Sequence, residues 1–284
     1  MKYSLGLYEK AMPPGMSFIE MLIMTSQCGF DRLEISIDES DSRLARLDWG
    51  TDQVHQLGRE MDDTGVPIKT MCLSGHRRFP LGSHDAKIRQ HSMDIMKKAV
   101  DLSAELGIAI IQLAGYDVYY ETGDASTVSF FEENLALATE YASTYGVILA
   151  FETMETPFMD TVSKAMKYVD QINSPYLGVY PDIGNLKNAA VLYGNDLLAD
   201  IQSGSGHIFA AHLKETRPGI YRDMNFGTVH TEYHDCIKLL WDMGVRIYTG
   251  EFWHDGKSNA ETVISYAAAF LRNEIDQAIM PVNN

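Results

Sequence analysis

Residues 147–152 read Val-Ile-Leu-Ala-Phe-Glu, a continuous apolar run that ends on a carboxylate. A strand buried on both faces has this character, whereas a half-buried strand alternates apolar and polar residues. Residues 108–111, Ile-Ala-Ile-Ile, repeat the pattern one predicted helix earlier in the chain. Because strands of this kind occur in parallel sheets that helices cover, the two stretches predict an α/β protein.

The same unit, a short apolar strand followed by an amphipathic helix, recurs eight times along the chain. Glycine ends several of the helices, and Ser17 with Glu20 and Ser258 with Glu261 form capping boxes that open two of them. Eight consecutive units predict a (β/α)8 TIM barrel. We expect strands at residues 3–7, 33–37, 68–73, 108–113, 147–151, 177–180, 208–211 and 245–248, and helices at 17–28, 52–64, 85–106, 127–145, 160–172, 192–201, 232–243 and 260–279.

An open doubly wound sheet is the alternative architecture. Its first turn between strand and helix usually carries a glycine-rich phosphate loop, and residues 7–10, Leu-Tyr-Glu-Lys, contain no glycine. No linker or shift in composition marks a second domain, and barrels of this length commonly form one unit. We therefore expect residues 1–284 to form a single barrel.

Composition excludes several classes of protein. The chain has 45% hydrophobic and 22% charged residues, as globular proteins do, and 23 basic against 39 acidic residues leave a net charge of −16. This charge argues against nucleic acid or an anionic membrane as a partner. No apolar run approaches the roughly 20 residues that cross a bilayer, and the first residues lack the apolar core of a signal peptide. Three widely spaced cysteines favour a reducing compartment, so we expect a cytoplasmic protein.

Four successive strand ends each carry a side chain that can bind a metal ion. Glu152 follows the fifth strand, Asp182 the sixth, His212 the seventh and Glu251 the eighth. The carboxyl ends of barrel strands meet at one rim, where barrel enzymes have their active sites. Three carboxylates and one imidazole suit one divalent ion such as zinc, manganese or cobalt. At the fifth strand Glu155 is an alternative ligand, and we favour Glu152 because it directly follows the apolar run.

Basic side chains near the same rim could bind a phosphate. Barrel enzymes often hold phosphate after strands seven and eight, which favours Lys214 and Arg217. Arg77 and Arg78 follow the third strand, where a surface ion pair is an equally good interpretation. The full set of expected substrate or phosphate ligands is Lys214, Arg217, Arg77, Arg78, His76 and Lys10.

The chain resembles the xylose isomerase-like barrels, in which sugar epimerases carry Glu, Asp, His and Glu on strands five to eight around one metal ion. Within that superfamily it resembles the L-ribulose-5-phosphate 3-epimerases, also called L-xylulose-5-phosphate 3-epimerases, of bacterial L-ascorbate catabolism. The resemblance selects Glu152 over Glu155 as the ligand. Small departures are Glu215, where the family often has Asp, and Arg217, where it has Lys. The matching stretches are residues 6–11, 46–49, 71–83, 111–120 and 180–186.

The resemblance implies a metal-dependent epimerisation at C3, which interconverts L-ribulose 5-phosphate and L-xylulose 5-phosphate through a metal-stabilised enediolate. Glu152 and Glu251 would be the acid–base pair and exchange roles with the direction of the reaction. Asp182 and His212 would be metal ligands only. By the same analogy we expect a homodimer.

Three other functions are open alternatives. An aldose–ketose isomerase uses a similar rim but usually two metal ions. An abasic-site nuclease of the endonuclease IV type needs further histidines, at positions where this chain has Asn185 and Gly115, and its negative charge also speaks against DNA. A sugar-phosphate-binding barrel without activity would not need the intact pair of Glu152 and Glu251.

Overall fold

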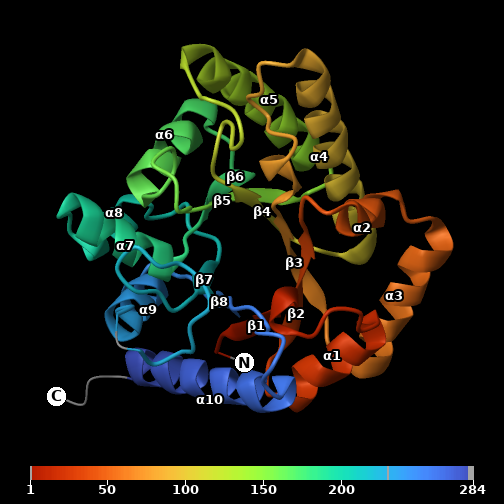
Figure 1. Ribbon diagram of the computed structural model, residues 1–284, viewed down its shortest axis with the longest axis vertical. Coiled ribbons are helices and arrows are strands. Elements are labelled where there is room, and N and C mark those ends of the chain that lie inside the picture. The colour runs from red at the N-terminus through yellow and green to blue at the C-terminus, as the bar shows by residue number, and fades with distance from the viewer. Residues whose placement is uncertain (1, 229, 281–284) are drawn as a thin grey trace.

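The computed structural model describes residues 2–228 and 230–280. Eight parallel strands form one sheet in the order β6-β5-β4-β3-β2-β1-β8-β7. Parallel bridges between Val179 and Ile208 and between Asp182 and His212 bring the two ends of this order together, so the barrel is nearly closed. The helices form a ring outside it (Figure 1). The predicted (β/α)8 barrel is confirmed.

The bounds of the elements are as follows. The strands are β1 (Ser4–Tyr8), β2 (Arg32–Ile37), β3 (Ile68–Leu73), β4 (Ile110–Ala114), β5 (Ile148–Glu152), β6 (Leu177–Tyr180), β7 (Ala211–Leu213) and β8 (Ile247–Gly250). The α-helices are α1 (Phe18–Gln27), α2 (Asp41–Leu44), α3 (Thr51–Thr64), α4 (Ala86–Leu106), α5 (Ala125–Thr144), α6 (Val162–Ile172), α7 (Ile183–Tyr193), α8 (Leu197–Ser203), α9 (Tyr233–Asp242) and α10 (Ala260–Ile279). Three 3-10 turns are η1 (Glu9–Ala11), η2 (Ala45–Asp48) and η3 (Gly75–Arg77).

Both faces of β5 are buried, which explains its continuous apolar sequence. Ala150 packs inside the barrel with Ile110 and Tyr180. Phe151, the next residue, points the other way and contacts the rings of Phe131 in α5 and Tyr168 in α6. Neither face of the strand therefore has room for a solvated side chain.

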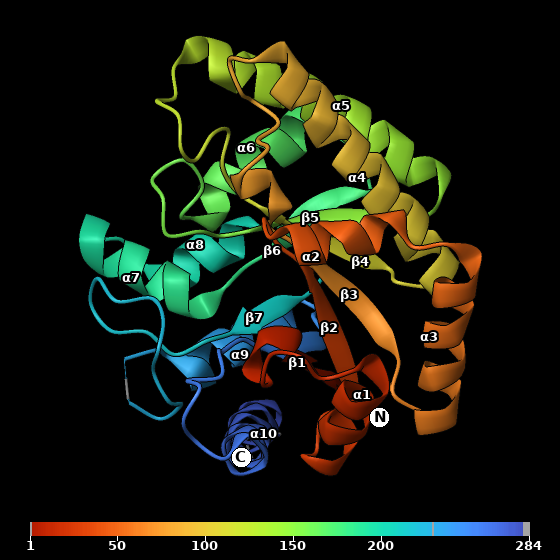
Figure 2. The ribbon, with the colours of Figure 1, turned by 45° about the vertical axis from the view of Figure 1, so that its right-hand side comes forward.

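The strand β2 differs, because polar and apolar side chains alternate along it. Arg32, Glu34 and Ser36 share one face and are fully buried, while Leu33 and Ile35 belong to the apolar core. Figure 2 shows this strand beside β3, with α3 outside them. The polar face of β2 therefore lines the interior of the barrel.

Strands β4, β7 and β8 begin two or three residues later than the sequence predicts. Residues 208–211 were expected to form the seventh strand, but β7 starts at Ala211, because residues before it meet β6 only through isolated hydrogen bonds. Residues 245–248 were expected to form the eighth, but β8 starts at Ile247. Val245 instead donates its N–H to the carbonyl of Leu240 and so completes the end of α9.

The helices that follow β6 and the cap of α10 also differ from the prediction. The expected helix at 192–201 is replaced by α7 and α8, and α7 begins directly after Asp182, whose Oδ1 accepts the N–H of Asn185. The expected capping box of Ser258 and Glu261 is absent, since Asn259 is the N-cap residue of α10. The capping box of α1 is confirmed. Within the described chain, no helix combines the length and apolar character that crossing a bilayer requires.

Candidate active site

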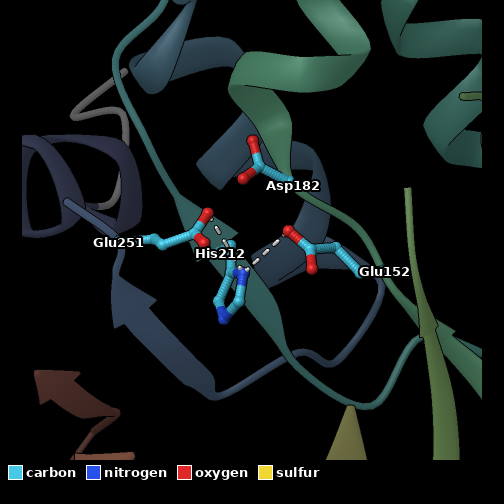
Figure 3. A group of neighbouring side chains, drawn as sticks. All are labelled: Glu152, Asp182, His212 and Glu251. Carbon is cyan, nitrogen blue, oxygen red and sulfur yellow. Dashed lines mark hydrogen bonds and ion pairs between the residues drawn. The ribbon is translucent and has the colours of Figure 1, made fainter. Parts of the chain in front are cut away.

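Four buried side chains meet at the carboxyl ends of strands β5 to β8. Glu152 is the last residue of β5, Asp182 follows β6, His212 lies in β7 and Glu251 directly follows β8. One ligand atom from each lies within 4.8 Å of the others. Glu152 and Glu251 extend toward His212 from opposite sides (Figure 3). The structure thus brings together the four residues that the spacing of the strands predicts.

The charged side chains of this group lie within ion-pair distance of one another. Nδ1 of His212 lies 3.4 Å from Oε1 of Glu152 and 3.5 Å from Oε2 of Glu251. The Nζ atom of Lys214 lies 2.8 Å from Oδ2 of Asp182 and 3.1 Å from Oε2 of Glu251. Lys214 is therefore part of this group and does not reach outward as a free phosphate ligand.

The crowded carboxylates shift one another's pKa values. Burial raises the pKa of Asp182 to about 8, against the opposing charge of Lys214. Burial and the charge of Glu251 raise the pKa of Glu152. Burial also acts to raise the pKa of Glu251, but the charges of Lys214 and His212 outweigh it and lower that pKa to about 2. Three carboxyl groups at this spacing ionise together only when positive charge lies among them.

Two carboxylate oxygens of this group have lone pairs that no hydrogen bond uses. Oδ2 of Asp182 and Oε2 of Glu251 are buried; the ammonium of Lys214 lies 2.8 Å and 3.1 Å from them, and no other described residue donates a hydrogen bond to either. Buried acceptors are normally satisfied, and a metal ion would satisfy these. Three oxygen donors and one nitrogen donor suit a divalent ion of intermediate hardness. The residues therefore fit a divalent cation.

Two polar side chains inside the barrel contact these ligands. Gln112 in β4 donates a hydrogen bond to Oε2 of Glu152. Oε1 of Glu34 in β2 lies 2.7 Å from Nε2 of His212. The sequence analysis missed both, although a polar residue within a predicted buried strand is the signal that could have found them.

Two of the expected phosphate ligands are paired with acidic residues. Nζ of Lys10 lies 2.6 Å from Oδ2 of Asp38, and Nη1 of Arg78 lies 2.7 Å from Oδ1 of Asp41. Arg78 is exposed, as the ion-pair alternative in the sequence analysis anticipates. The charge of each is thus matched within the protein.

The two residues before Arg78 lie in different surroundings. Nε2 of His76 lies 3.2 Å from the carbonyl of Ser92 in α4, and burial lowers the pKa of His76 to about 4. This imidazole is neutral at physiological pH and faces a helix, so it offers no charge to a phosphate. Arg77 is half-buried, and its guanidinium lies 4.8 Å from the ring centre of Tyr119.

A pocket beside the four candidate metal ligands extends between the loops that follow β7 and β8. Lys214 and Glu251 line one end, and Arg222, Trp253 and Phe226 lie along it. The guanidinium of Arg222 lies 5.1 Å from the ring centre of Trp253.

The two arginines of the loop after β7 are placed differently. Nη2 of Arg222 lies 3.6 Å from Oε1 of Glu155, at the rim of the barrel. Both arginines are exposed, but Arg217 does not line the pocket; its backbone N–H bonds to the carbonyl of Ile220. The sequence offers no signal for Arg222, because the path of this long loop does not follow from periodicity.

Comparison with known proteins places the chain in a family. The sequence model of the xylose isomerase-like TIM barrel family matches residues 24–274. The chain belongs to this family. It is 40% identical over 277 residues to the L-ribulose-5-phosphate 3-epimerase UlaE of Salmonella paratyphi A, covering 97% of this chain and 96% of that protein. The UlaE protein of Salmonella typhimurium is also 40% identical, over 275 residues. The chain thus belongs to the L-ribulose-5-phosphate 3-epimerase family, and the resemblance in sequence is confirmed.

Solved structures of sugar epimerases share the fold. D-Psicose 3-epimerase from Clostridium cellulolyticum H10, solved with D-tagatose, superimposes with a TM-score of 0.80 at 14% identity, covering 96% of this chain and 99% of that one. An L-ribulose 3-epimerase superimposes with a TM-score of 0.77 at 16% identity, covering 97% and 95%. At these identities the likeness concerns the fold. The curated relatives and these structural neighbours are sugar epimerases, which are isomerases.

Proposed function

We propose that the protein interconverts L-ribulose 5-phosphate and L-xylulose 5-phosphate by inverting the configuration at C3. The observation that carries this proposal is the meeting of Glu152, Asp182, His212 and Glu251 at one rim, in a chain 40% identical over nearly its whole length to an L-ribulose-5-phosphate 3-epimerase. The two sugars differ only at C3, and C3 lies next to the C2 carbonyl, which makes its proton removable.

The four residues would hold one divalent cation, which we propose to be zinc, manganese or cobalt. When bound, such a cation supplies the positive charge that stabilises negative charge developing on the substrate oxygens as the C3 proton leaves. Asp182 and His212 serve to hold the cation. Asp182 is fixed in this role because its Oδ1 also caps α7.

Glu152 and Glu251 are the proposed proton carriers. Inversion requires that a proton leaves C3 from one face of the sugar and that another is added from the opposite face. The two carboxyl groups approach the centre of the cluster from opposite sides (Figure 3), so a sugar held between them presents one face to each. Glu152 would take the proton in one direction of the reaction and Glu251 in the other.

Arg222 is the residue that we propose for the phosphate. It lines the pocket that begins at Lys214 and Glu251, in the loop after β7, and this region holds phosphate in many barrel enzymes. A guanidinium can form two parallel hydrogen bonds to a phosphate. A phosphate bound by Arg222 would lie toward Trp253, and the sugar would extend from it toward the two glutamates.

The experiment that tests the proposal is NMR of L-ribulose 5-phosphate with the enzyme in deuterated water, with and without a chelator. We expect deuterium at C3 and formation of L-xylulose 5-phosphate, both lost on chelation and restored by the metal. Deuterium at C1 with an aldose product would instead show an aldose–ketose isomerase. Absence of any exchange by metal-loaded enzyme would overturn the assignment of a ketopentose phosphate.

A further inference from the structure

Glu34 contacts the candidate metal cluster from inside the barrel. Its Oε1 lies 2.7 Å from Nε2 of His212, and both side chains are fully buried. The residue comes from the middle of β2, on the opposite side of the barrel from β6 in strand order. Burying a carboxylate costs free energy unless the charge is paired, so Glu34 needs the contact with His212 to lie where it does.

The two ring nitrogens of His212 face different groups. Nε2 faces Glu34, whereas Nδ1 faces Glu152 and Glu251 at 3.4 Å and 3.5 Å. An ionised carboxylate only accepts hydrogen bonds, and Glu34 is the nearest carboxylate to the ring, so a neutral imidazole carries its proton on Nε2 and keeps the lone pair of Nδ1 directed at the cluster.

We propose that Glu34 is a positioning residue, which holds His212 so that Nδ1 binds the cation and Nε2 carries the proton. The inference rests on the metal site of the proposed function. A carboxylate that accepts the second N–H of a ligating histidine fixes the orientation of the ring and strengthens it as a ligand.

The orientation of Glu34 is itself fixed by its second oxygen. Oε2 accepts hydrogen bonds from Oγ1 of Thr70 at 2.6 Å, the hydroxyl of Tyr180 at 2.8 Å and Oγ1 of Thr249 at 3.3 Å. Arg32 donates to both threonine oxygens at 2.7 Å. Because the guanidinium can only donate, the Thr70 hydroxyl keeps its own proton free for Glu34, while the Thr249 hydroxyl shares its hydrogen bonding between Glu34 and the Tyr180 oxygen, 2.7 Å away. The network thus directs Oε1 toward His212.

Space for this network depends on Gly6 in β1. A Cβ atom at residue 6 would lie 2.6 Å from the guanidinium carbon of Arg32. Any larger residue would therefore displace the arginine that orients Thr70 and Thr249. Gly6 opens one of the stretches that carry the family resemblance.

The variant Glu34→Gln tests the proposal because an amide has one acceptor oxygen instead of two. The glutamine side chain keeps the shape of glutamate, but its one oxygen cannot accept hydrogen bonds both from His212 on one side and from the three hydroxyl groups on the other. The matched control is Thr249→Val, which removes the longest of the three hydroxyl contacts to Glu34, an acceptor for Arg32 and a partner of the Tyr180 hydroxyl, but does not touch His212. Both variants disturb the same buried network, and only the first disturbs the histidine.

The measurement is the dissociation constant of Zn²⁺ by competition with a chromophoric chelator, with the unfolding of the metal-free proteins followed in parallel. We expect Glu34→Gln to bind Zn²⁺ about 10- to 100-fold more weakly, and Thr249→Val to stay within about threefold of wild type. Equal affinity of Glu34→Gln and wild type, or an equal loss in both variants, would overturn the proposal. A wild type that binds no Zn²⁺ would overturn the metal site as well.

A measurement on the wild type decides the question if the variant does not fold. Long-range proton–nitrogen NMR of the zinc-loaded protein identifies which nitrogen of each histidine carries a proton. We expect His212 to bear its proton on Nε2 and to bind zinc through Nδ1. The opposite assignment would overturn the proposal.

Discussion

Gln112 in β4 donates a hydrogen bond from its amide to Oε2 of Glu152, the last residue of the neighbouring strand β5. Both side chains are buried, so water does not compete for this contact. The donor fixes the direction in which the proposed proton carrier presents its other oxygen.

Replacing Gln112 by Met should therefore lower kcat. The methionine fills the space but donates nothing, and loss of an orienting partner of this kind typically costs about 10- to 100-fold in activity or metal affinity. We expect kcat to fall by about 10-fold with little change in KM, measured at saturating metal. An unchanged kcat would show that Glu152 is oriented by the cation and the strand alone.

The variants Glu152→Gln and Glu251→Gln should each abolish net epimerisation. Removing a positioned acid or base costs about 10²- to 10⁴-fold, and inversion needs both. Each variant should still exchange the C3 proton of the one epimer whose base remains, which NMR in deuterated water detects. Because both residues are proposed ligands, the bound metal is quantified in the same samples. Full epimerase activity in Glu152→Gln would show that Glu152 is not one of the two proton carriers.

Removal of the metal should lower the melting temperature. A ligand that binds only the folded state at 100 times its dissociation constant stabilises by about 2.7 kcal/mol. Thermal unfolding with and without added Zn²⁺ measures the shift. In Asp182→Asn we expect a smaller shift of the melting temperature, because a neutral amide replaces one of the three carboxylate ligands. A shift of equal size in the variant would place the cation elsewhere.

Arg222→Met should raise KM for the phosphorylated ketose, whereas Arg217→Met should not. Both residues belong to the loop after β7, but only Arg222 lines the pocket that reaches Glu251. Charged hydrogen bonds contribute about 1.5 to 3 kcal/mol, so we expect KM to rise by about 10- to 100-fold. Steady-state kinetics on L-ribulose 5-phosphate checks this, and an equal effect of both substitutions would count against the assignment.

The sequence predicts the residues at the strand ends of this barrel, but not the contacts between side chains in its interior. The run at 147–152 identifies a strand buried on both faces, and the residues that end strands five to eight identify the cluster, because strand ends of a barrel share one rim. Glu34 could not be assigned in this way, since its partner His212 is 178 positions away and the contact crosses the interior of the barrel.

The long loops are where prediction from sequence fails for a different reason. Lys214 follows the seventh strand, as a phosphate ligand would, yet its ammonium forms ion pairs with Asp182 and Glu251. Arg222 lies five positions beyond Arg217 and reaches the pocket only because of the path of the backbone. Neither placement follows from hydrophobic periodicity, which reports burial on regular elements alone.

His76 should make the stability of the protein sensitive to pH. Burial lowers its pKa from 6.5 to about 4 in the folded protein. As the pH falls through 6.5 the unfolded chain takes up a proton that the folded one does not. The stability that neutral His76 contributes is thus present above pH 6.5 and is lost on the way down to about pH 4, at about 1.4 kcal/mol per pH unit.

His76→Gln keeps a donor for the carbonyl of Ser92 and does not titrate. Between about pH 7.5 and pH 5.5, wild type should lose about 1.4 kcal/mol more unfolding free energy than this variant in urea titrations. Parallel pH dependences of the two proteins would show that His76 is protonated, or exposed, in the folded state.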